Sequence, residues 1–345
     1  MVLKILLHLA LGRNRWLPVA FALAVGGLSA CREPNGDPRE GAAFPEQTAT
    51  TPETHSSPRG AELSPLGRAH GRIAFLTDRG TNQLWEIFTM RSNGTRQRRL
   101  TRSNLYLDAT SRIEWSPHGN EMSFDAGQEG GGEIVVVHTR SMRRRTVFSD
   151  DPNGSYVGPQ TPDWSPDGRH VVFATAWGDL FVVGSDGSEA QRIATSKGRD
   201  TYKWPAWSPD GEGIAFTCEC PRSRRGLYVI KPDGSDLRRV TPGLAHQPDW
   251  SPRGEWLAFS GGSRGTPQIY VVTAEGGKKR RLTETPENFD PTWSPDGRYI
   301  AFESNRNGNA EIYVITKRGQ GETRLTRNPA SDFAPAWEPR RERKR

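Results

Sequence analysis

Short runs of hydrophobic residues, each three to five positions long, recur along the chain after about residue 70. They are rich in Val, Ile, Phe and Tyr and are bounded by Gly, Asp and Asn, a pattern that predicts β-strands. In residues 293–326, Trp-Ser-Pro-Asp-Gly precedes a hydrophobic run at 300–302, a second run at 312–315 and a final Leu-Thr pair. Ser-Pro-Asp-Gly favours a tight turn, because Pro fixes φ and Gly tolerates positive φ. Each such stretch therefore predicts four short strands.

The same motif recurs at a nearly constant spacing. Copies begin at Trp115, Trp164, Trp207, Trp250 and Trp293, and a shortened copy begins at Trp337, so that the spacing is 43 to 49 residues. A fixed period of this length indicates one supersecondary unit that is repeated. Four strands in about 43 residues are typical of one blade of a β-propeller. We expect the six repeated tryptophans to pack between blades.

The number of blades follows from how the strands are distributed. Six sets of second, third and fourth strands can be counted, beginning with hydrophobic runs at 73–75 and 84–90. The first set has no Trp-containing strand before it, and the last such strand, at 333–337, has no set after it. A ring resolves both, because the C-terminal strand would become the innermost strand of the first blade and would cover the sheet edge that an open array leaves exposed. The sequence thus predicts an all-β fold: a six-bladed β-propeller of four-stranded blades over residues 72–339, closed by the C-terminal strand.

These repeats resemble the TolB-type, WD-like propeller repeat, whose blades carry Pro-x-Trp-Ser-Pro-Asp-Gly followed by Ile-Ala-Phe, Ser-Asn-Arg and Ile-Tyr-Val. Residues 293–326 match this pattern nearly throughout, and the resemblance covers roughly residues 72–339. The match is weaker in blade two, which has the longest spacing, and in blade four, where Cys-Glu-Cys-Pro at 218–221 replaces the usual turn. TolB itself carries an α/β domain before its propeller, so the resemblance extends to the propeller alone.

Residues 1–30 are predicted to be a targeting segment. Lys4, Arg13 and Arg15 precede a hydrophobic run at 16–27, which is too short to span a bilayer comfortably. A basic start, a short hydrophobic core and small residues before a cleavage point are typical of a secretory signal. Leu-Ser-Ala before Cys31 resembles the bacterial lipobox, which implies acylation of Cys31; the alternative is an ordinary signal peptide with a chance Cys. By resemblance to Gram-negative lipoproteins, Arg32 favours anchoring in the outer membrane, facing the periplasm.

Residues 31–71 and 340–345 flank the propeller. The first segment is dominated by Pro, Glu, Thr, Ser and Gly and has no hydrophobic periodicity, so it cannot bury enough surface to order itself and is predicted to be a disordered tether. Its mean reach would be roughly 35 Å. The second segment is a basic tail, which we expect to be a solvated end, with contact to anionic lipid as the alternative.

Charge and cysteine content narrow the possible partners. The formal net charge is +7, and basic surfaces can bind nucleic acid, but the export signal argues against that and favours anionic polymers of the cell envelope. We expect a monomer without a cofactor or metal. Cys218 and Cys220 are two positions apart, so on a strand they face the same way. They could form a local disulfide, stay free thiols or supply half of a metal site; we favour one of the first two.

The sequence gives little support for catalysis. Residues 261–265 match Gly-x-Ser-x-Gly, but that nucleophile elbow requires a strand, a sharp turn and a helix, whereas here it falls in a hairpin turn. No His follows His246, although the elbow's partners should end in one. We therefore predict a protein without catalytic residues. A propeller-type polysaccharide lyase is the remaining enzymatic alternative, because its catalytic groups would converge only in space.

The expected binding surface is the end of the ring that carries the loops between blades. These loops contain large side chains that can anchor a partner, since such anchors concentrate binding energy. The candidates are Tyr106, Tyr156, Tyr202, Trp204, His246, Phe289, Asp290 and Phe333. The alternative is that half of them pack within the blade tops. We therefore predict a non-enzymatic envelope lipoprotein whose loops bind a protein or peptide, with a polysaccharide-binding protein or lyase as the alternative.

Overall fold

The computed structural model describes residues 71–80, 85–101, 107, 111–128, 131–150, 157–263, 265–285 and 287–340. The predicted signal segment, Cys31, the tether up to residue 70 and residues 341–345 of the basic tail lie outside these ranges. Nowhere in the described ranges is there a helix with the length and hydrophobicity needed to cross a bilayer.

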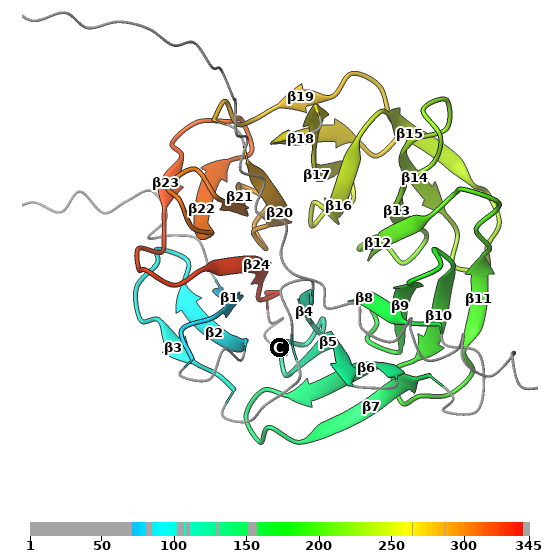
Figure 1. Cartoon of the computed structure of the whole chain (residues 1–345), viewed down its shortest axis with the longest axis horizontal. Helices are drawn as coiled ribbons and strands as arrows, with labels where there is room; N and C mark the ends of the chain where they lie inside the picture. The colour runs from blue at the N-terminus through cyan, green and yellow to red at the C-terminus, as the bar shows by residue number, and fades with distance from the viewer. Residues whose placement is uncertain are drawn as a thin grey trace, which may run out of the picture. The chain divides into compact units, whose positions relative to one another are not determined.

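The described residues form 24 strands in six antiparallel sheets, which are arranged around a ring (Figure 1). Blade one contains β24 (Asp332–Trp337), β1 (Arg72–Thr77), β2 (Glu86–Arg91) and β3 (Arg98–Arg99). Blade two contains β4 (Ile113–Trp115), β5 (Glu121–Gln128), β6 (Gly131–His138) and β7 (Arg144–Ser149), and blade three contains β8 (Pro159–Trp164), β9 (His170–Thr175), β10 (Leu180–Gly184) and β11 (Gln191–Ala194). Blade four contains β12 (Tyr202–Trp207), β13 (Ile214–Cys218), β14 (Gly226–Ile230) and β15 (Arg238–Pro242). Blade five contains β16 (Ala245–Trp250), β17 (Trp256–Ser263), β18 (Thr266–Thr273) and β19 (Arg280–Arg281), and blade six contains β20 (Asn288–Trp293), β21 (Tyr299–Ser304), β22 (Glu311–Thr316) and β23 (Thr323–Arg324).

The predicted closure of the ring is confirmed. The C-terminal strand β24 pairs antiparallel with β1, with Ile73 opposite Trp337 and Leu76 opposite Phe333. The ion pair between Arg72 and Glu338, at 2.8 Å, fastens one end of this pairing. Because the first and last strands of the propeller share one sheet, blade one has four strands like the other five blades.

The repeated tryptophans pack between blades, as predicted. Trp115 of blade two lies in a hydrophobic cluster with residues of blade one, and its indole N–H donates to the Ala336 carbonyl at 3.2 Å. Trp250 of blade five donates in the same way to the Ala206 carbonyl of blade four, at 3.0 Å. The second strand of every blade also buries one phenylalanine almost completely: Phe75, Phe124, Phe173, Phe216, Phe259 and Phe302. The six hydrophobic clusters thus each lie at one interface between neighbouring blades.

Five of the six inner strands contain the same bulge. In each, the residue three positions before the repeated tryptophan has φ between 45° and 52°, and the pairing register shifts there. These residues are Thr161, Trp204, Gln247, Asp290 and Ala334. A proline follows each of them and cannot donate to the ladder. Blade two has Ile113 at the proline position, and its strand β4 has no such residue. The bulge therefore accompanies the Pro-x-Trp sequence, and it turns the residue before the proline out of the regular pleat.

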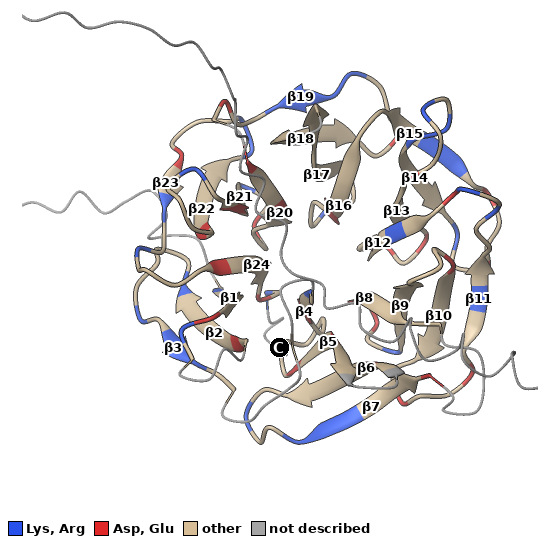
Figure 2. Ribbon diagram, in the orientation of Figure 1, with Lys and Arg blue, Asp and Glu red and all other residues tan. Residues whose placement is uncertain are grey.

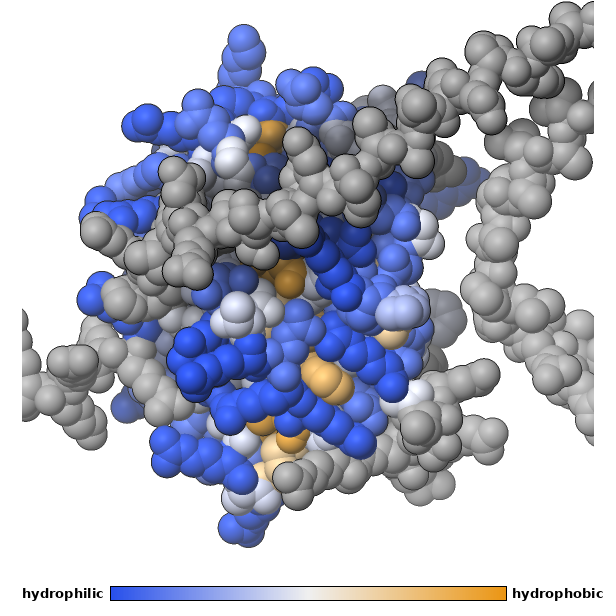
Figure 3. All heavy atoms as spheres, turned by 90° about the vertical axis from the view of Figure 1, so that its left-hand side faces the viewer, coloured by the Kyte–Doolittle hydropathy of each residue, from blue (hydrophilic) through white to orange (hydrophobic). Residues whose placement is uncertain are grey.

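Arginines occupy the outer strands, which form the rim of the ring (Figure 2). Several pair with an acid in the same blade, including Arg99 with Glu86 at 2.7 Å and Arg324 with Glu311 at 2.6 Å. The part of the rim that faces the viewer in Figure 3 is mostly hydrophilic, with a few separate hydrophobic residues. Charged side chains on edge strands oppose pairing with another chain. The rim is thus built to stay solvated, which leaves the two ends of the ring for recognition.

Candidate functional site

The antiparallel order of each blade gives the two ends of the ring different connections. The hairpins between second and third strands, and the links from each outer strand to the next inner strand, all lie at one end, which we call the loop face. The Ser-Pro-x-Gly turns and the hairpins between third and fourth strands lie at the opposite end, the turn face. Binding residues on loops are held in place by a rigid scaffold, so the loop face is the first place to look for a site.

A cavity of about 620 Å³ opens on the loop face between blades four, five and six. Its walls come from hairpin and linking residues of all three blades: Glu219, Arg225, Leu244, His246, Gly261, Ser263, Gly265, Pro267, Glu287, Phe289 and Asn305. We call it the loop-face pocket. It combines one aromatic ring, exposed backbone and both signs of charge, and its volume falls in the range of about 300–1,000 Å³ typical of ligand pockets.

His246 connects the wall of this pocket to blade four. Its ring lies edge to face against Trp204, with centroids 5.0 Å apart, and its Nδ1 is 3.6 Å from Glu219 Oε1. Glu219 also pairs with Lys203 Nζ at 3.1 Å. Burial lowers the pKa of His246, in spite of the opposing effect of Glu219. At neutral pH the imidazole is therefore uncharged and can both donate and accept a hydrogen bond.

A second group of charged side chains converges on the axis of the ring. Arg112 stands just before strand β4, and its Nε donates to Glu114 Oε1 at 2.9 Å. Its charge also interacts with Asp163 of blade three, Asp249 of blade five and Asp290 of blade six. Glu303 of blade six interacts in turn with Asp290. We call these six residues the axial cluster: Arg112, Glu114, Asp163, Asp249, Asp290 and Glu303.

Five carboxyl groups and one guanidinium make the axial cluster prone to hold protons. Burial raises the pKa of Asp249 and of Asp290 to about 6. It raises the pKa of Glu303 to about 8, and the nearby charge of Asp290 adds to the effect. The pKa of Glu114 is likewise raised by burial, although Arg112 opposes the shift. The cluster therefore gains negative charge as the pH rises through the neutral range.

Two of these aspartates also serve the fold. Asp163 accepts a hydrogen bond from the Trp207 backbone N–H at 2.6 Å, and Asp249 accepts the equivalent bond from Trp293, also at 2.6 Å. Each bond links one blade to the next. Arg112, in contrast, keeps a buried Nη1 donor that has no partner among the described residues. A buried donor without a partner is costly, so this atom is a ready hydrogen-bond donor for a ligand that reaches the axis.

The structure separates the predicted binding residues into distinct groups. His246 and Phe289 line the loop-face pocket, and Trp204 contacts His246 behind its wall. Asp290 belongs to the axial cluster and directly follows Phe289, so the pocket and the cluster adjoin on strand β20. Tyr106 and Tyr156 lie outside the described residues.

Two predicted residues take part in packing. Phe333 is only 7% exposed and packs edge to face against Trp85, so it belongs to the core of blade one and offers no surface to a partner. Tyr202 is half-buried and packs edge to face against Phe216, with centroids 5.0 Å apart. Both rings stand where an inner strand begins, and there packing against the neighbouring strand competes with exposure.

Sequence reasoning missed an exposed aromatic residue on the loop face. Trp177, in the hairpin between β9 and β10, is 68% exposed. It is not one of the six repeated tryptophans, and this difference from the repeat could have identified it as a candidate binding residue. Glu219, Arg225 and Asn305 of the pocket were also missed, because residues on three separate hairpins meet only once the ring is closed.

The structure also places the two motifs that could have carried chemistry. The Gly-x-Ser-x-Gly sequence spans the hairpin between β17 and β18, and no helix follows it among the described residues. In the structure Cys218 and Cys220 are bonded as a disulfide, with their Cα atoms 5.1 Å apart. The Gly-x-Ser-x-Gly hairpin therefore does not provide the strand, turn and helix of a hydrolase elbow.

Comparison with known proteins gives the following matches. A family model described as the TolB β-propeller domain matches residues 66–242 and 204–287. TolB from Acinetobacter baumannii is 17% identical over 78% of this chain and 67% of its own, with a TM-score of 0.66. The structure of a nidogen/laminin complex contains a chain that is 11% identical over 78% and 98% of the two chains, with a TM-score of 0.62. An oligogalacturonate lyase in complex with manganese is 18% identical over 75% and 74%, with a TM-score of 0.53. No protein with a curated description matches the sequence. At these identities the structures show a shared fold alone.

Proposed function

Because the chain belongs to the TolB β-propeller domain family, we propose that it is a non-enzymatic recognition protein of the bacterial cell envelope, which binds a protein or peptide partner at its loop face. In this proposal the chain is exported, acylated at Cys31 and held at the outer membrane, with a monomeric propeller facing the periplasm. The partner enters the loop-face pocket and reaches toward the axial cluster.

The loop-face pocket is the observation that carries this proposal. It offers the Phe289 ring, the uncharged His246 imidazole and the Gly261 to Gly265 hairpin within one cavity of about 620 Å³. Hydrophobic anchors seated in such a cavity, with polar groups around them, concentrate the binding energy of a protein interface. Trp177 extends the same face toward blade three. A folded surface or an extended peptide could use both positions at once.

The charge of the axial cluster favours a partner that brings hydrogen-bond donors or a basic side chain. Five carboxyl groups face a single guanidinium there, so a polyuronate chain would meet like charge at the axis. The same charges disfavour the lyase alternative wherever the carboxylates of a substrate would bind there without a bridging cation. A lysine or arginine of a protein partner would instead find several acceptors.

Site-specific photo-crosslinking in the bacterium of origin tests the proposal. A photoreactive phenylalanine analogue is placed at Trp177, at Phe289 or at Leu237, which is 52% exposed on the turn face and serves as the matched control. We expect the same protein to be crosslinked from both loop-face positions and not from Leu237. Equal capture from all three positions, or none from either loop-face position, would overturn the proposal.

The lyase alternative has its own direct assay. Purified protein is incubated with polygalacturonate, with and without manganese, and the absorbance of the unsaturated product is followed. We expect no product above that of a heat-denatured sample. Turnover that is lost in a Glu287→Gln/His246→Ala variant would show that the pocket is catalytic and that recognition is not its main function.

A further inference from the structure

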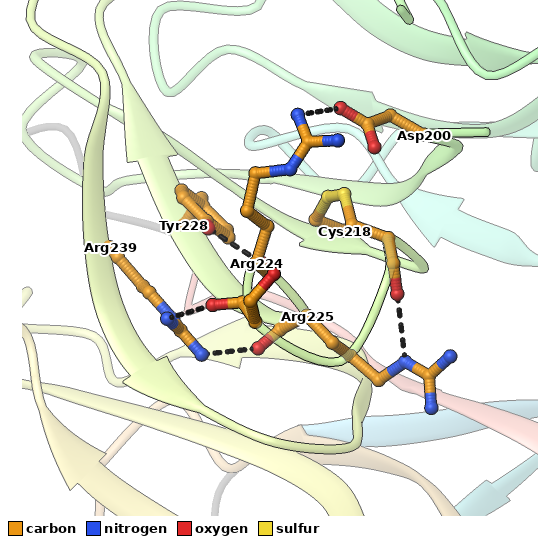
Figure 4. Close-up of a disulfide and its surroundings, with 8 residues drawn as sticks. Asp200, Cys218, Arg224, Arg225, Tyr228 and Arg239 are labelled. Carbon is orange, nitrogen blue, oxygen red and sulfur yellow. Dashed lines mark hydrogen bonds and ion pairs between the residues drawn. A yellow bond between two sulfur atoms is a disulfide. The ribbon is translucent and has the colours of Figure 1, made fainter. Parts of the chain in front are cut away.

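The hairpin between β13 and β14 brings together two cysteines and an aspartate outside the sites described above. One oxygen of Asp200 and the sulfur atoms of Cys218 and Cys220 all lie within 4.8 Å of one another. The three residues are buried, with 6%, 3% and 2% of their surface exposed. Figure 4 shows the disulfide next to Asp200 and Arg224. Soft sulfur ligands beside a carboxylate are the donor set of a zinc-type site.

The backbone holds these residues in place from both sides. Cys218 ends β13 opposite Tyr202, and the Glu219 N–H donates to the Thr201 carbonyl at 2.9 Å, so the loop that carries Asp200 is fixed against the hairpin. On the other side of the hairpin, Arg225 Nε donates to the Cys220 carbonyl at 3.2 Å. The ligand atoms are therefore carried by paired strands and a bonded turn, a scaffold that suits a defined coordination geometry.

Asp200 is the part of this arrangement that a disulfide alone does not explain. Arg224 Nη1 donates to Asp200 Oδ2 at 2.8 Å, whereas Asp200 Oδ1 is buried and has no hydrogen-bond partner among the described residues. In blade one, Asp332 is also buried and paired with an arginine, but both of its oxygens are bonded by Arg79. Asp200 thus keeps one carboxylate oxygen available, next to two sulfur atoms.

We propose that reduction of the Cys218–Cys220 disulfide converts this cluster into a site for a thiophilic divalent cation of the zinc class, with both sulfur atoms and Asp200 Oδ1 as ligands. The ligand atoms of a tetrahedral zinc site stand about 3.5 Å apart, which follows from metal–ligand bonds of about 2.0–2.3 Å. The three ligand atoms already lie within 4.8 Å of one another, and reduction frees the two sulfur atoms to move apart from bonding distance to this ligand spacing. A fourth position stays open for water or another donor.

The charges balance in both states. Reduction by an external dithiol adds two electrons and two protons to the cysteines, and the dithiol is itself oxidised to a disulfide. Binding of the cation then releases both thiol protons. The three negative charges of the ligands are offset by the divalent cation and by the Arg224 guanidinium, so the buried site is neutral. In the oxidised state, Asp200 and Arg224 alone form a neutral pair.

Cobalt titration of the full-length chain tests the proposal. The chain carries Cys31→Ser, so that Cys218 and Cys220 are its only thiols. One sample is reduced with a water-soluble phosphine, which takes up oxygen from water as it is oxidised, and one is left oxidised. We expect the reduced chain to bind one equivalent of Co²⁺, with a thiolate-to-cobalt charge-transfer band and intense visible bands of tetrahedral geometry. Zinc should displace the cobalt, and the oxidised chain should bind neither ion.

Two substitutions separate the ligands from their surroundings. Asp200→Asn should weaken binding by about tenfold or more, whereas the matched Asp332→Asn in blade one should leave it unchanged. Circular dichroism confirms that each variant is folded, and the comparison of reduced with oxidised chain requires no substitution within the cluster. The proposal is overturned if the reduced chain binds no cobalt, if the oxidised chain binds equally well, or if Asp200→Asn and Asp332→Asn bind with the same affinity.

Discussion

The closing strand and its neighbour in blade six contain the same residue at the same repeat position, and this provides an internal test of the architecture. Phe333 in β24 and Phe289 in β20 both lie four positions before the repeated tryptophan. Phe333 is buried in the core of blade one, whereas Phe289 is half-buried and lines the loop-face pocket. We predict that Phe333→Ala strongly destabilises the propeller and that Phe289→Ala does so only slightly.

The expected difference follows from packing. Truncation of a buried phenylalanine costs about 3–5 kcal/mol through lost transfer energy and the cavity left behind. Phe333 also loses its edge-to-face contact with Trp85, whose centroid is 4.6 Å away, and such pairs contribute about 0.5–1.5 kcal/mol beyond buried area. Phe289 already meets solvent in the pocket, so its truncation should cost about 1 kcal/mol. For a domain of this size the melting temperature should fall by roughly 10 °C for Phe333→Ala and by only a few degrees for Phe289→Ala.

Thermal and urea unfolding of the purified variants, followed by tryptophan fluorescence, measure both effects. Trp85→Ala and the double variant complete a mutant cycle, which isolates the contact between the two rings. The reasoning about ring closure would be refuted if Phe333→Ala were no more destabilising than Phe289→Ala. If the effects of Phe333→Ala and Trp85→Ala were additive, the contact between the two rings would be refuted, but the closure of the ring would not.

Further predictions concern the axial cluster and two hairpin turns, one in blade one and one in blade six. The folded state holds protons on carboxyl groups with raised pKa values, about 8 for Glu303 and about 6 for Asp249, whereas the unfolded chain releases them near pH 4. The free energy of unfolding should therefore decrease by about 1–3 kcal/mol as the pH rises from about 5 to about 8. Glu303→Gln should make this decrease smaller. If the melting temperature fell equally with pH in the variant and the unchanged protein, Glu303 would not be one of the groups that hold a proton. Arg112→Met should destabilise the chain by about 2–4 kcal/mol, because it leaves half-buried carboxyl groups without their cation, and should make the pH dependence steeper in the same assay. Gly94→Ala should destabilise the chain by about 2–3 kcal/mol and Gly308→Ala by about 1 kcal/mol. Both glycines have positive φ, but a Cβ at Gly94 would lie 2.5 Å from the Leu325 carbonyl oxygen, whereas a Cβ at Gly308 would have no atom within 4 Å. Equal losses of stability in urea unfolding would contradict the role given to the Gly94 contact.

The repeat made the fold predictable from sequence. Each Trp-Ser-Pro-x-Gly copy marks the end of an inner strand, and the unmatched strand at 333–337 required a ring. The same periodicity predicted that tryptophans would pack between blades, because a residue kept at every period serves the unit that is repeated. The bulge could not be predicted in this way. The Pro-x-Trp sequence indicates that one backbone N–H is missing from the strand pairing. The positive φ of the residue before the proline is seen only in the structure, where the pairing register shifts at that residue.

The candidate site was predictable only where a single loop defines it. His246 and Phe289 were found because each stands at the start of an inner strand, next to a link between blades. Apart from Asp290, the axial cluster was not predicted, since its members are far apart in sequence and converge only across the ring. Phe333 was assigned wrongly to the surface for a related reason: it shares its repeat position with Phe289, and only the neighbouring Trp85 decides that it is buried. Sequence periodicity thus identifies equivalent positions, and local packing decides which of them are exposed.

If the loop face binds a partner as proposed, the residues that differ among equivalent positions are the best guide to what it binds. At the position three before the tryptophan, the repeat holds Thr161, Trp204, Gln247, Asp290 and Ala334 in the same left-handed conformation. Such a conformation costs about 1–3 kcal/mol at each non-glycine residue, yet glycine, which would relieve it, occurs at none of them. The five positions have the same backbone conformation but different side chains. The fold therefore explains why each strand has a bulge, but not which residue occupies it. Since Asp290 reaches the axial cluster and Trp204 contacts His246 of the pocket, these side chains would set the partner's chemistry. Exchange of Trp204 or Asp290 for alanine should then change which partner is bound while the fold remains intact.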